Sequence, residues 1–257
     1  MEETSKRELP VYLAPGKRLF QVVVHMKDAP GSLSSILDKL VNSVNMVSAS
    51  SYSLKDGTAV FSSFAEALAD DVTAGSIKED LASLDACLEA RVEEGKEGLL
   101  VDTFHTGFRT DEGEYMLLRR DGVAEVFDHI VKIFGTGGEV LLYEEGKALG
   151  KYSSVKGIKD FGRERVLASV VYLSRSLTSQ GWGLVDLDMG RDGAGPVVKV
   201  SDCFECSGGK SLRKGCDFFR GYCEGIAEGF SGRKAKVEET ECTLRGDKGC
   251  VFAVNLG

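Results

Sequence analysis

A chain of 257 residues, 42% of them hydrophobic and 28% charged, has the composition of an ordinary soluble globular protein with one large or two average domains. Its formal net charge of -8 at pH 7 argues against direct binding to nucleic acid or to an anionic membrane surface. The polar beginning MEETSKRELP is unlike a signal peptide and no apolar run is long enough for a membrane span, so we expect a cytoplasmic protein.

Seven cysteines are the least random feature of the composition. An odd number of cysteines in a chain without an export signal favours metal ligands or thiol chemistry over disulfides. Four of them fall between Cys203 and Cys223, and Cys242 and Cys250 follow closely.

A flexible tail is expected over residues 1–16, and a first folded unit over residues 17–95. Alternating apolar residues mark its strands, and apolar residues at helical spacing mark its helices. The resulting order βαββαβ is that of a ferredoxin-like domain, in which both helices cover one face of an antiparallel sheet. In chain order, the strands and helices are expected at residues 19–26, 32–40, 46–54, 58–64, 77–84 and 87–92.

The turn Asp28-Ala29-Pro30-Gly31, with the strand before it and the helix after it, resembles the start of an ACT domain. Members of that family are small regulatory modules that often bind amino acids and pair through their sheets. The free N–H groups at a helix N-terminus attract a carboxylate, which favours an effector at this turn. Equally, these residues can serve only to form the turn and cap the helix, with the module serving only for dimerisation. The effector-binding residues implied by the resemblance are Asp28, Pro30, Gly31, Ser32 and Leu33.

Residues 96–114 are expected to form a linker, because their polar, glycine-containing start is followed by no regular pattern. A second unit is predicted over residues 115–257. The glycine run 135–138 lacks the lysine and hydroxyl residue of a phosphate loop, so it indicates a helix end. The elements expected before the last helix are a helix over 123–134, a buried strand over 139–143, a short helix between Gly146 and Gly150, a helix over 166–177, and strands over 183–188 and 197–200 joined by the turn 189–196.

The last predicted helix, over residues 212–230, carries a glycine at every fourth position: Gly221, Gly225 and Gly229. Glycine costs helix stability, so the repeat predicts that another element packs closely against this backbone. Aromatic side chains around the helix are candidates for a pocket, although such stripes usually belong to a core. The candidate pocket-lining residues are Trp182, Phe219 and Tyr222.

Two predicted strands follow this helix and are joined by the turn 245–249, which brings Cys242 and Cys250 together across a hairpin. With Cys216 near the helix start and a carboxylate from the acidic run 238–241, these thiols fit the tetrahedral ligand set of a structural zinc site. The alternative is that the cysteines are small buried hydrophobic residues.

A set of spaced cysteines, glycines and acidic residues runs through this part of the chain. It consists of Cys216, Gly221-Tyr222, Gly225, Gly232-Arg233, Glu239-x-x-Cys242 and Gly246-Asp247-x-x-Cys250. From about residue 115 the chain therefore resembles the vinyl-4-reductase-type domain. That family includes an accessory protein of bacteriochlorophyll synthesis, the sensor halves of phenol- and xylene-responsive transcription activators, and archaeal proteins described as hydrocarbon-binding. The zinc ligands implied by the phenol-sensing members are Cys216, Glu239, Cys242 and Cys250.

The spacing of the carboxylate poses a geometric problem. Positions three apart in a regular strand face opposite sides, so Glu239 and Cys242 reach one ion only if a β-bulge lies near Thr240. Glu238 shares a face with Cys242 and is the substitute ligand.

Cys203-Phe204-Glu205-Cys206 is a CxxC pair that the resemblance does not explain. It can be a second metal half-site, a redox pair, or two thiols at a strand end. Cys223 is the nearest candidate for a third thiol in such a site.

The predicted fold class is α+β: a ferredoxin-like domain followed by a larger ligand-sensing domain with an antiparallel sheet and a metal clip. No nucleotide-binding loop or paired nucleophile is found, and a fully coordinated zinc suits structure rather than catalysis. We therefore expect a dimeric cytosolic sensor, not an enzyme, that binds an apolar or aromatic small molecule, with the ACT-like module serving for dimerisation or for binding an amino acid. The alternatives are an enzyme or accessory factor for a tetrapyrrole or aromatic substrate, with Cys203 and Cys206 as redox thiols, and a purely structural adaptor.

Overall fold

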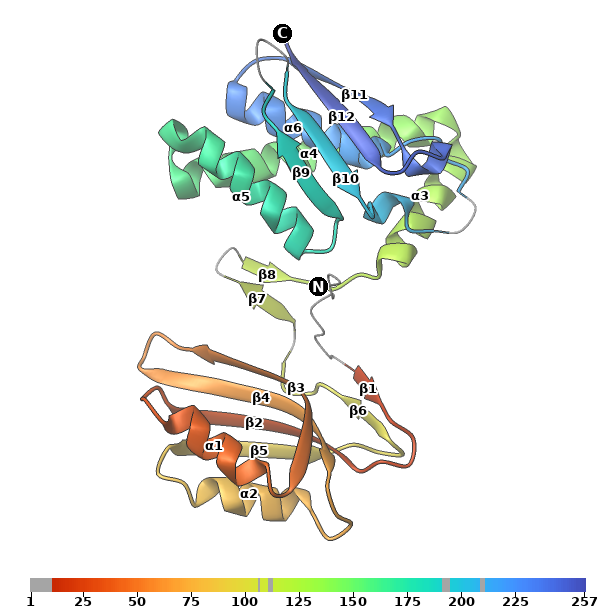
Figure 1. The fold of residues 1–257 in the computed structure, drawn as a ribbon. Helices are drawn as coiled ribbons and strands as arrows, with labels where there is room; N and C mark the ends of the chain where they lie inside the picture. The colour runs from red at the N-terminus through yellow and green to blue at the C-terminus, as the bar shows by residue number, and fades with distance from the viewer. Residues whose placement is uncertain (1–10, 106, 111–112, 191–194, 209–210) are drawn as a thin grey trace. The chain divides into compact units, whose positions relative to one another are not determined.

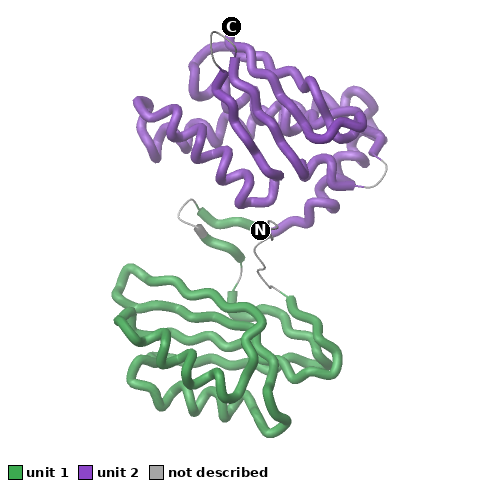
Figure 2. Tube along the Cα trace, in the orientation of Figure 1, with its two compact units in different colours: residues 1–116 green, residues 117–257 purple. Residues whose placement is uncertain are grey.

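The computed structural model divides into two compact units, residues 1–116 and 117–257 (Figure 1 and Figure 2). It describes residues 11–105, 107–110, 113–190, 195–208 and 211–257.

The predicted tail, residues 1–16, lies largely outside the described residues. Its last part is not a plain tail, because β1 (Val11–Leu13) pairs antiparallel with β6 (Leu99–Val101). The small cluster of Leu19, Phe64 and Leu100, with Tyr12 packed against it, explains why these strands stay on the unit.

A four-stranded antiparallel sheet in the order β3-β4-β2-β5 forms the first unit, and two helices cover one of its faces (Figure 1). The inward residues of β2, Phe20, Val22 and Val24, are fully buried and pack with Ile36 and Leu40 of the first helix, as alternation and helical spacing require. The elements are β2 (Leu19–Lys27), α1 (Ser32–Leu40), β3 (Val44–Ser53), β4 (Thr58–Ala67), α2 (Ala74–Ala82) and β5 (Cys87–Glu94).

The segment predicted as a linker, residues 96–114, is partly fixed to the first unit. Gln21 is buried in β2 and needs hydrogen-bond partners there. Its amide donates to Asp102 at 2.6 Å, and the backbone N–H of Thr103 donates back to Gln21 at 3.2 Å. The carboxylate of Asp102 also accepts from the N–H of His105 at 3.0 Å. The short strands of this segment are β6, β7 (Phe108–Thr110) and β8 (Gly113–Tyr115).

The second unit contains an antiparallel sheet in the order β11-β12-β10-β9. Helix α6 packs on β11 and β12, α4 packs along α6, and α5 packs beside β9 (Figure 1). The predicted turn 189–196 falls partly on residues that lie outside the described ones. The elements are α3 (Arg120–Phe134), α4 (Thr136–Phe161), η1 (Arg163–Arg165), α5 (Val166–Ser179), β9 (Leu184–Asp188), β10 (Val197–Ser201), η2 (Phe204–Cys206), α6 (Asp217–Ser231), β11 (Ala235–Glu241), η3 (Thr243–Arg245) and β12 (Cys250–Leu256).

The buried strand predicted over residues 139–143 is wrong, because these residues lie inside the 26-residue helix α4. A short apolar run cannot be distinguished from a helix segment by periodicity alone. In α4 only Leu142 of this run is fully buried, while Val140 is 61% exposed and Leu141 42% exposed. Among the described residues, no helix combines the length and the apolar character needed to cross a membrane.

The close approach predicted from the glycine repeat of α6 is confirmed, and α4 is the partner. A Cβ atom at Gly221 would overlap the carbonyl oxygen of Tyr143, and one at Gly225 would overlap that of Lys147. Helix α4 supplies its own glycines to the same contact, since a Cβ at Gly150 would lie 2.9 Å from a backbone nitrogen of α6. The two backbones therefore touch, which leaves the opposite face of α6 to the sheet.

Candidate metal centre and apolar pocket

Three cysteines from different elements meet at the start of α6. Cys216 is the N-cap residue of the helix, Cys242 follows β11, and Cys250 begins β12. The sulfur atom of Cys216 lies 3.7 Å from each of the other two, which are 3.9 Å apart. All three side chains are buried.

A β-bulge brings the acidic strand into the right orientation. The pairing of β11 with β12 shifts register between Glu239 and Glu241, so Thr240 is the extra residue. The predicted bulge is confirmed. A carboxylate oxygen of Glu239 consequently lies within 4.8 Å of the thiols of Cys216, Cys242 and Cys250. Glu238 is instead largely exposed and is paired with a lysine.

The donor chemistry and spacing of this set fit a structural zinc ion. Four ligands at about 2.3 Å around one tetrahedral ion are separated by about 3.8 Å from one another. The three thiol separations of 3.7–3.9 Å match that edge length. Thiolate sulfur in a tetrahedral arrangement is typical of zinc or of iron rather than of magnesium or calcium.

The carboxylate of Glu239 is fixed by two further contacts. It accepts the backbone N–H of Cys216 at 3.1 and 3.2 Å, and a guanidinium N–H of Arg245 at 3.2 Å. Gly215 is required beside it, since a Cβ there would lie 2.5 Å from a carboxylate oxygen of Glu239. Burial raises the pKa of Glu239.

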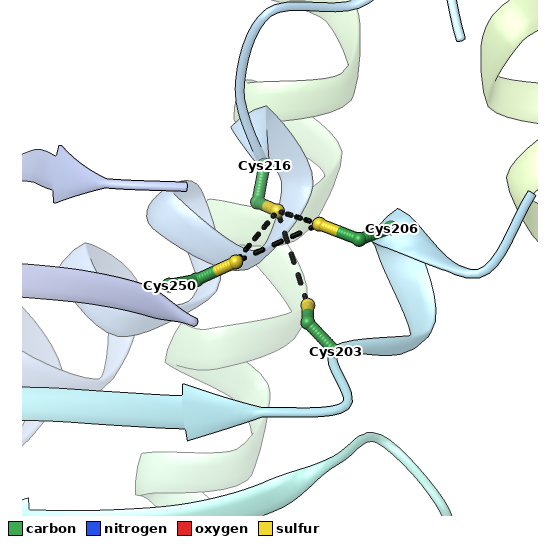
Figure 3. A group of neighbouring side chains, drawn as sticks. All are labelled: Cys203, Cys206, Cys216 and Cys250. Atoms are coloured by element: carbon green, nitrogen blue, oxygen red, sulfur yellow. Dashed lines mark hydrogen bonds between the residues drawn. The ribbon is translucent and has the colours of Figure 1, made fainter. Parts of the chain in front are cut away.

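The CxxC pair belongs to the same cluster, which the sequence did not predict. The sulfur of Cys206 lies 3.2 Å from that of Cys216, and the sulfur of Cys203 lies 3.9 Å from it (Figure 3). The missing partner pair of the CxxC motif thus consists of cysteines that the sequence interpretation had assigned to the first site. Cys223, the predicted third thiol of a second site, belongs to neither group of candidate ligands.

The thiols perturb one another because one thiolate is stabilised by hydrogen bonds from its neighbours. Hydrogen bonding, first with Cys203, raises the pKa of Cys216 and lowers the pKa of Cys250. Burial also raises the pKa of Cys216. The cluster therefore favours few negative charges unless a cation balances them.

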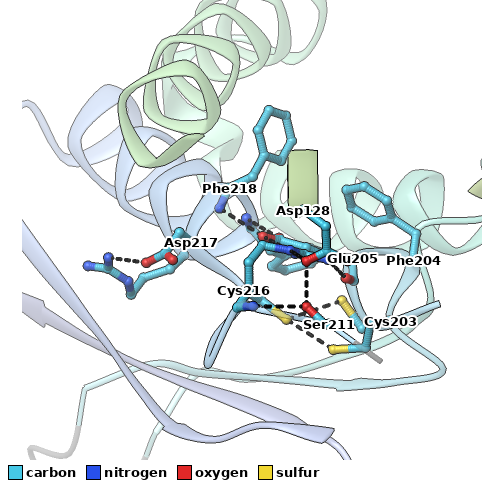
Figure 4. Close-up of polar contacts among 12 residues, drawn as sticks. Asp128, Cys203, Phe204, Glu205, Ser211, Cys216, Asp217 and Phe218 are labelled. Carbon is cyan, nitrogen blue, oxygen red and sulfur yellow. Dashed lines mark hydrogen bonds and ion pairs between the residues drawn. The ribbon is translucent and has the colours of Figure 1, made fainter. Parts of the chain in front are cut away.

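A buried ion pair anchors the turn that carries the CxxC pair. Glu205 is fully buried, and its carboxylate accepts from the N–H of Phe218 at 3.2 Å, from the N–H of Phe219 at 2.9 Å and from Arg213 at 3.2 Å (Figure 4). Arg213 also donates to Asp128 of α3 at 2.9 Å. Burial raises the pKa of Glu205, while the N–H of Phe219 and the charge of Arg213 oppose this shift.

A cavity of about 200 Å³ lies between α5, the sheet and the face of α6 opposite its glycines. Phe219 and Tyr222 contribute to its lining, as does Cys223. Trp182 is not among the lining residues, but its ring packs 5.0 Å from that of Tyr222. The lining comprises Val166, Val170, Leu173, Ser174, Leu177, Val185, Leu187, Met189, Pro196, Val198, Phe219, Tyr222, Cys223, Ile226, Ala227, Phe230, Ser231, Val254 and Leu256.

The lining of the cavity is almost entirely apolar in character. Ser174 and Ser231 line it, but their hydroxyls donate to carbonyls of their own helices at 2.8 and 2.6 Å. Burial raises the pKa of Cys223, so this residue stays an uncharged thiol. A molecule that enters this cavity gains chiefly from the removal of apolar surface from water.

The turn predicted to bind an effector joins β2 to α1 in the first unit. Gly31 has φ +90°, a conformation that favours glycine, and is the N-cap residue of α1. No side chain caps this helix, so Asp28 does not serve that role. Ser32 is buried, and Leu33 is 36% exposed.

Residues 196–256 match the model of the vinyl-4-reductase domain family, so the C-terminal region contains a domain of this type. This range includes the whole thiol cluster and part of the cavity lining. An uncharacterised protein of Methanocaldococcus jannaschii is 28% identical over 138 residues, which cover 51% of this chain and 72% of that protein.

Among solved structures, the phenol-responsive sensory domain of the transcription activator PoxR with phenol superimposes with a TM-score of 0.46 and 18% identity, covering 57% of this chain and 82% of that one. A vinyl-4-reductase family protein from Methanocaldococcus jannaschii gives a TM-score of 0.34 and 19% identity, covering 56% of this chain and 98% of that one.

Proposed function

We propose that the C-terminal unit binds an apolar or aromatic small molecule in the cavity beside α6, and that the protein is a cytosolic sensor rather than an enzyme. A structural zinc ion is held at the thiol cluster. The N-terminal unit serves for dimerisation or for binding an amino acid. Direct contact with nucleic acid or membrane is not part of this function, in keeping with the net charge of -8.

The observation that carries this proposal is the apolar lining of a cavity within the unit that contains the vinyl-4-reductase domain. The lining residues of α6, among them Phe219, Tyr222 and Ile226, lie on the face opposite the glycines that contact α4. The same helix begins at Cys216. The thiol cluster therefore holds the start of the helix whose side chains form one wall of the cavity.

The proposed zinc is structural. Cys216, Cys242 and Cys250, together with a fourth donor, saturate a tetrahedral ion and leave no open position for a substrate. In the ligand set expected from the sequence, the fourth donor is Glu239. When bound, the ion ties α6 to β11 and β12 and contributes to folding stability. We do not adopt the redox-enzyme alternative, because Cys203 and Cys206 lie within contact of the other thiols and are available to the metal.

The N-terminal unit is proposed to be ferredoxin-like and ACT-like. The βαββαβ order, the strand order β3-β4-β2-β5 and the glycine turn before α1 support this assignment. Strands β3 and β5 are the edges of this sheet, and edge strands are the means by which two sheets pair. A homodimer is therefore expected, and light scattering of the full chain tests it: a strictly monomeric mass rejects this part of the proposal.

The single tryptophan makes ligand binding measurable. Trp182 packs on Tyr222 and lies 6.0 Å from Phe219, both of which line the cavity. Toluene and phenol can be titrated into the full chain while the fluorescence of Trp182 is recorded. We expect saturable binding of toluene at least as tight as that of phenol, because the lining offers little to hydrogen-bond a hydroxyl.

A matched pair of variants assigns the binding to the cavity. Ala227→Phe adds a ring at a lining position, whereas Val155→Phe adds one on an exposed face of α4. The first variant should abolish the toluene response and the second should preserve it. Loss of binding in both variants, or in neither, would contradict the proposed site.

A further inference from the structure

The thiol of Cys206 lies as close to Cys216, Cys242 and Cys250 as those three lie to one another. Its sulfur is 3.2 Å from that of Cys216, 3.6 Å from that of Cys250 and 4.0 Å from that of Cys242. The other three separations are 3.7, 3.7 and 3.9 Å. All the edges of this sulfur tetrahedron are therefore close to the roughly 3.8 Å expected around one ion with bonds of about 2.3 Å.

The position of Cys206 is set by backbone and buried charge rather than by the thiols alone. Its N–H donates to the carbonyl of Cys203 at 3.0 Å, which closes the η2 turn. Glu205, within that turn, accepts from the N–H of Phe219 at 2.9 Å. The turn is thus fastened to the first turn of α6, the helix that starts at Cys216, so the two thiols are held together in advance of any ion (Figure 4).

Glu239 is already engaged in another role. Its carboxylate accepts the N–H of Cys216 and a guanidinium N–H of Arg245. A buried carboxylate that holds the backbone of a ligand and an arginine has the contacts of a residue that orients the ligands from outside. Arg245 and the N-terminus of α6 also supply positive charge beside a site that would carry four thiolates.

Cys203 is the competing thiol. Its sulfur is 3.9 Å from that of Cys216, and within 4.8 Å of those of Cys206 and Cys250. The set that contains it is therefore less compact than the set that contains Cys242. Because Cys203 is buried and belongs to the same CxxC motif, it offers a matched control for Cys206.

We infer that Cys206, and not Glu239, is the fourth metal ligand, so that Cys206, Cys216, Cys242 and Cys250 hold one ion in an all-sulfur tetrahedron. Glu239 is a positioning residue that fixes Cys216 through its backbone N–H. This assignment rests on the proposed structural metal. It accounts for the CxxC motif, which the zinc ligands expected from the sequence leave without a role.

X-ray absorption at the zinc K-edge tests the assignment on the full chain loaded with Zn²⁺ under reducing conditions. We expect a first shell of sulfur alone, at about 2.3 Å. A mixed shell with an oxygen at about 2.0 Å that disappears in Glu239→Gln would overturn the inference while leaving the zinc site in place. A wild-type chain that takes up no Zn²⁺ would instead overturn the proposed metal, and the inference with it.

Three variants give an independent readout by competition for Zn²⁺ with a chromophoric chelator. Cys206→Ser should lose one sulfur from the shell and weaken Zn²⁺ binding by more than about 100-fold, the upper end of what outer-shell changes cause. Cys203→Ser and Glu239→Gln should keep four sulfur ligands, with a loss of about 10- to 100-fold for the latter. Four sulfurs in Cys206→Ser would refute the assignment. If that variant does not fold, the wild-type and Glu239→Gln spectra decide.

Discussion

Gly221→Ala probes the backbone contact that positions the cavity wall of α6. The added Cβ would overlap the carbonyl oxygen of Tyr143 and would lie 2.9 Å from its carbonyl carbon and 3.0 Å from the backbone nitrogen of Lys147. These are backbone atoms of α4, and they cannot rotate away as a flexible side chain can. Helices α4 and α6 must therefore separate to accommodate one methyl group.

The magnitude follows from two opposing terms. Overpacking of this kind costs about 1–3 kcal/mol. Replacing a mid-helix glycine by alanine returns about 0.5–1 kcal/mol through backbone entropy and helix propensity. We expect a net loss of about 1–2 kcal/mol in the free energy of unfolding of the second unit, which corresponds to a decrease of roughly 3–8 °C in its Tm.

Thermal unfolding followed by the fluorescence of Trp182 reports on the second unit, because it is the only tryptophan in the sequence. Gly137→Ala is the control within α4, since a Cβ there meets nothing within 4 Å. The control should leave the Tm unchanged or raise it slightly. Equal Tm values for Gly221→Ala and the wild type would refute the tight α4–α6 contact.

Three further changes have defined outcomes. Removing the metal with a chelator under reducing conditions should lower the Tm of the second unit and leave that of the first unchanged, as calorimetry can show; two unchanged transitions would count against the metal. Burial raises the pKa of Glu228, but hydrogen bonds from Lys151 and Lys147 outweigh it and lower the pKa to about 2. The stabilisation from Glu228 is thus present above its unfolded pKa of about 4.3 and is lost as the pH falls towards about 2, so Glu228→Gln should flatten acid denaturation in that window, and an unaltered profile would argue against the ion pairs. Thr73→Ala removes the capping box of α2 with Ser76 and should destabilise the first unit by about 1 kcal/mol in a denaturant titration; no change in midpoint would contradict that role.

The strands and helices of the first unit were predictable because each depends on local periodicity. The alternation along β2 and the apolar spacing of α1 recur in the burial of Phe20, Val22 and Ile36. Helix α4 was not predictable as one helix, because its glycines suggest breaks. Their reason is the contact with α6, which no local pattern of α4 reveals, although the matching glycine repeat of α6 indicated that such a partner exists.

At the site, the hairpin motif predicted that Cys242 and Cys250 meet, and the parity of the strand predicted the bulge at Thr240. The approach of Cys206 could not be predicted in the same way. It depends on a long-range anchor, the contacts of buried Glu205 with Arg213 and the first turn of α6. A fully buried carboxylate between two cysteines is not evident from residue type alone, since acidic side chains are usually exposed.

Native mass spectrometry of the full chain, purified under reducing conditions and exposed to toluene, is the most direct test of the central claim that the second unit combines a structural metal with an apolar binding cavity. The account predicts a complex that carries one zinc ion per chain and either a copurified apolar molecule or toluene. A folded chain with the mass of the polypeptide alone, without metal and without uptake of toluene, would contradict it.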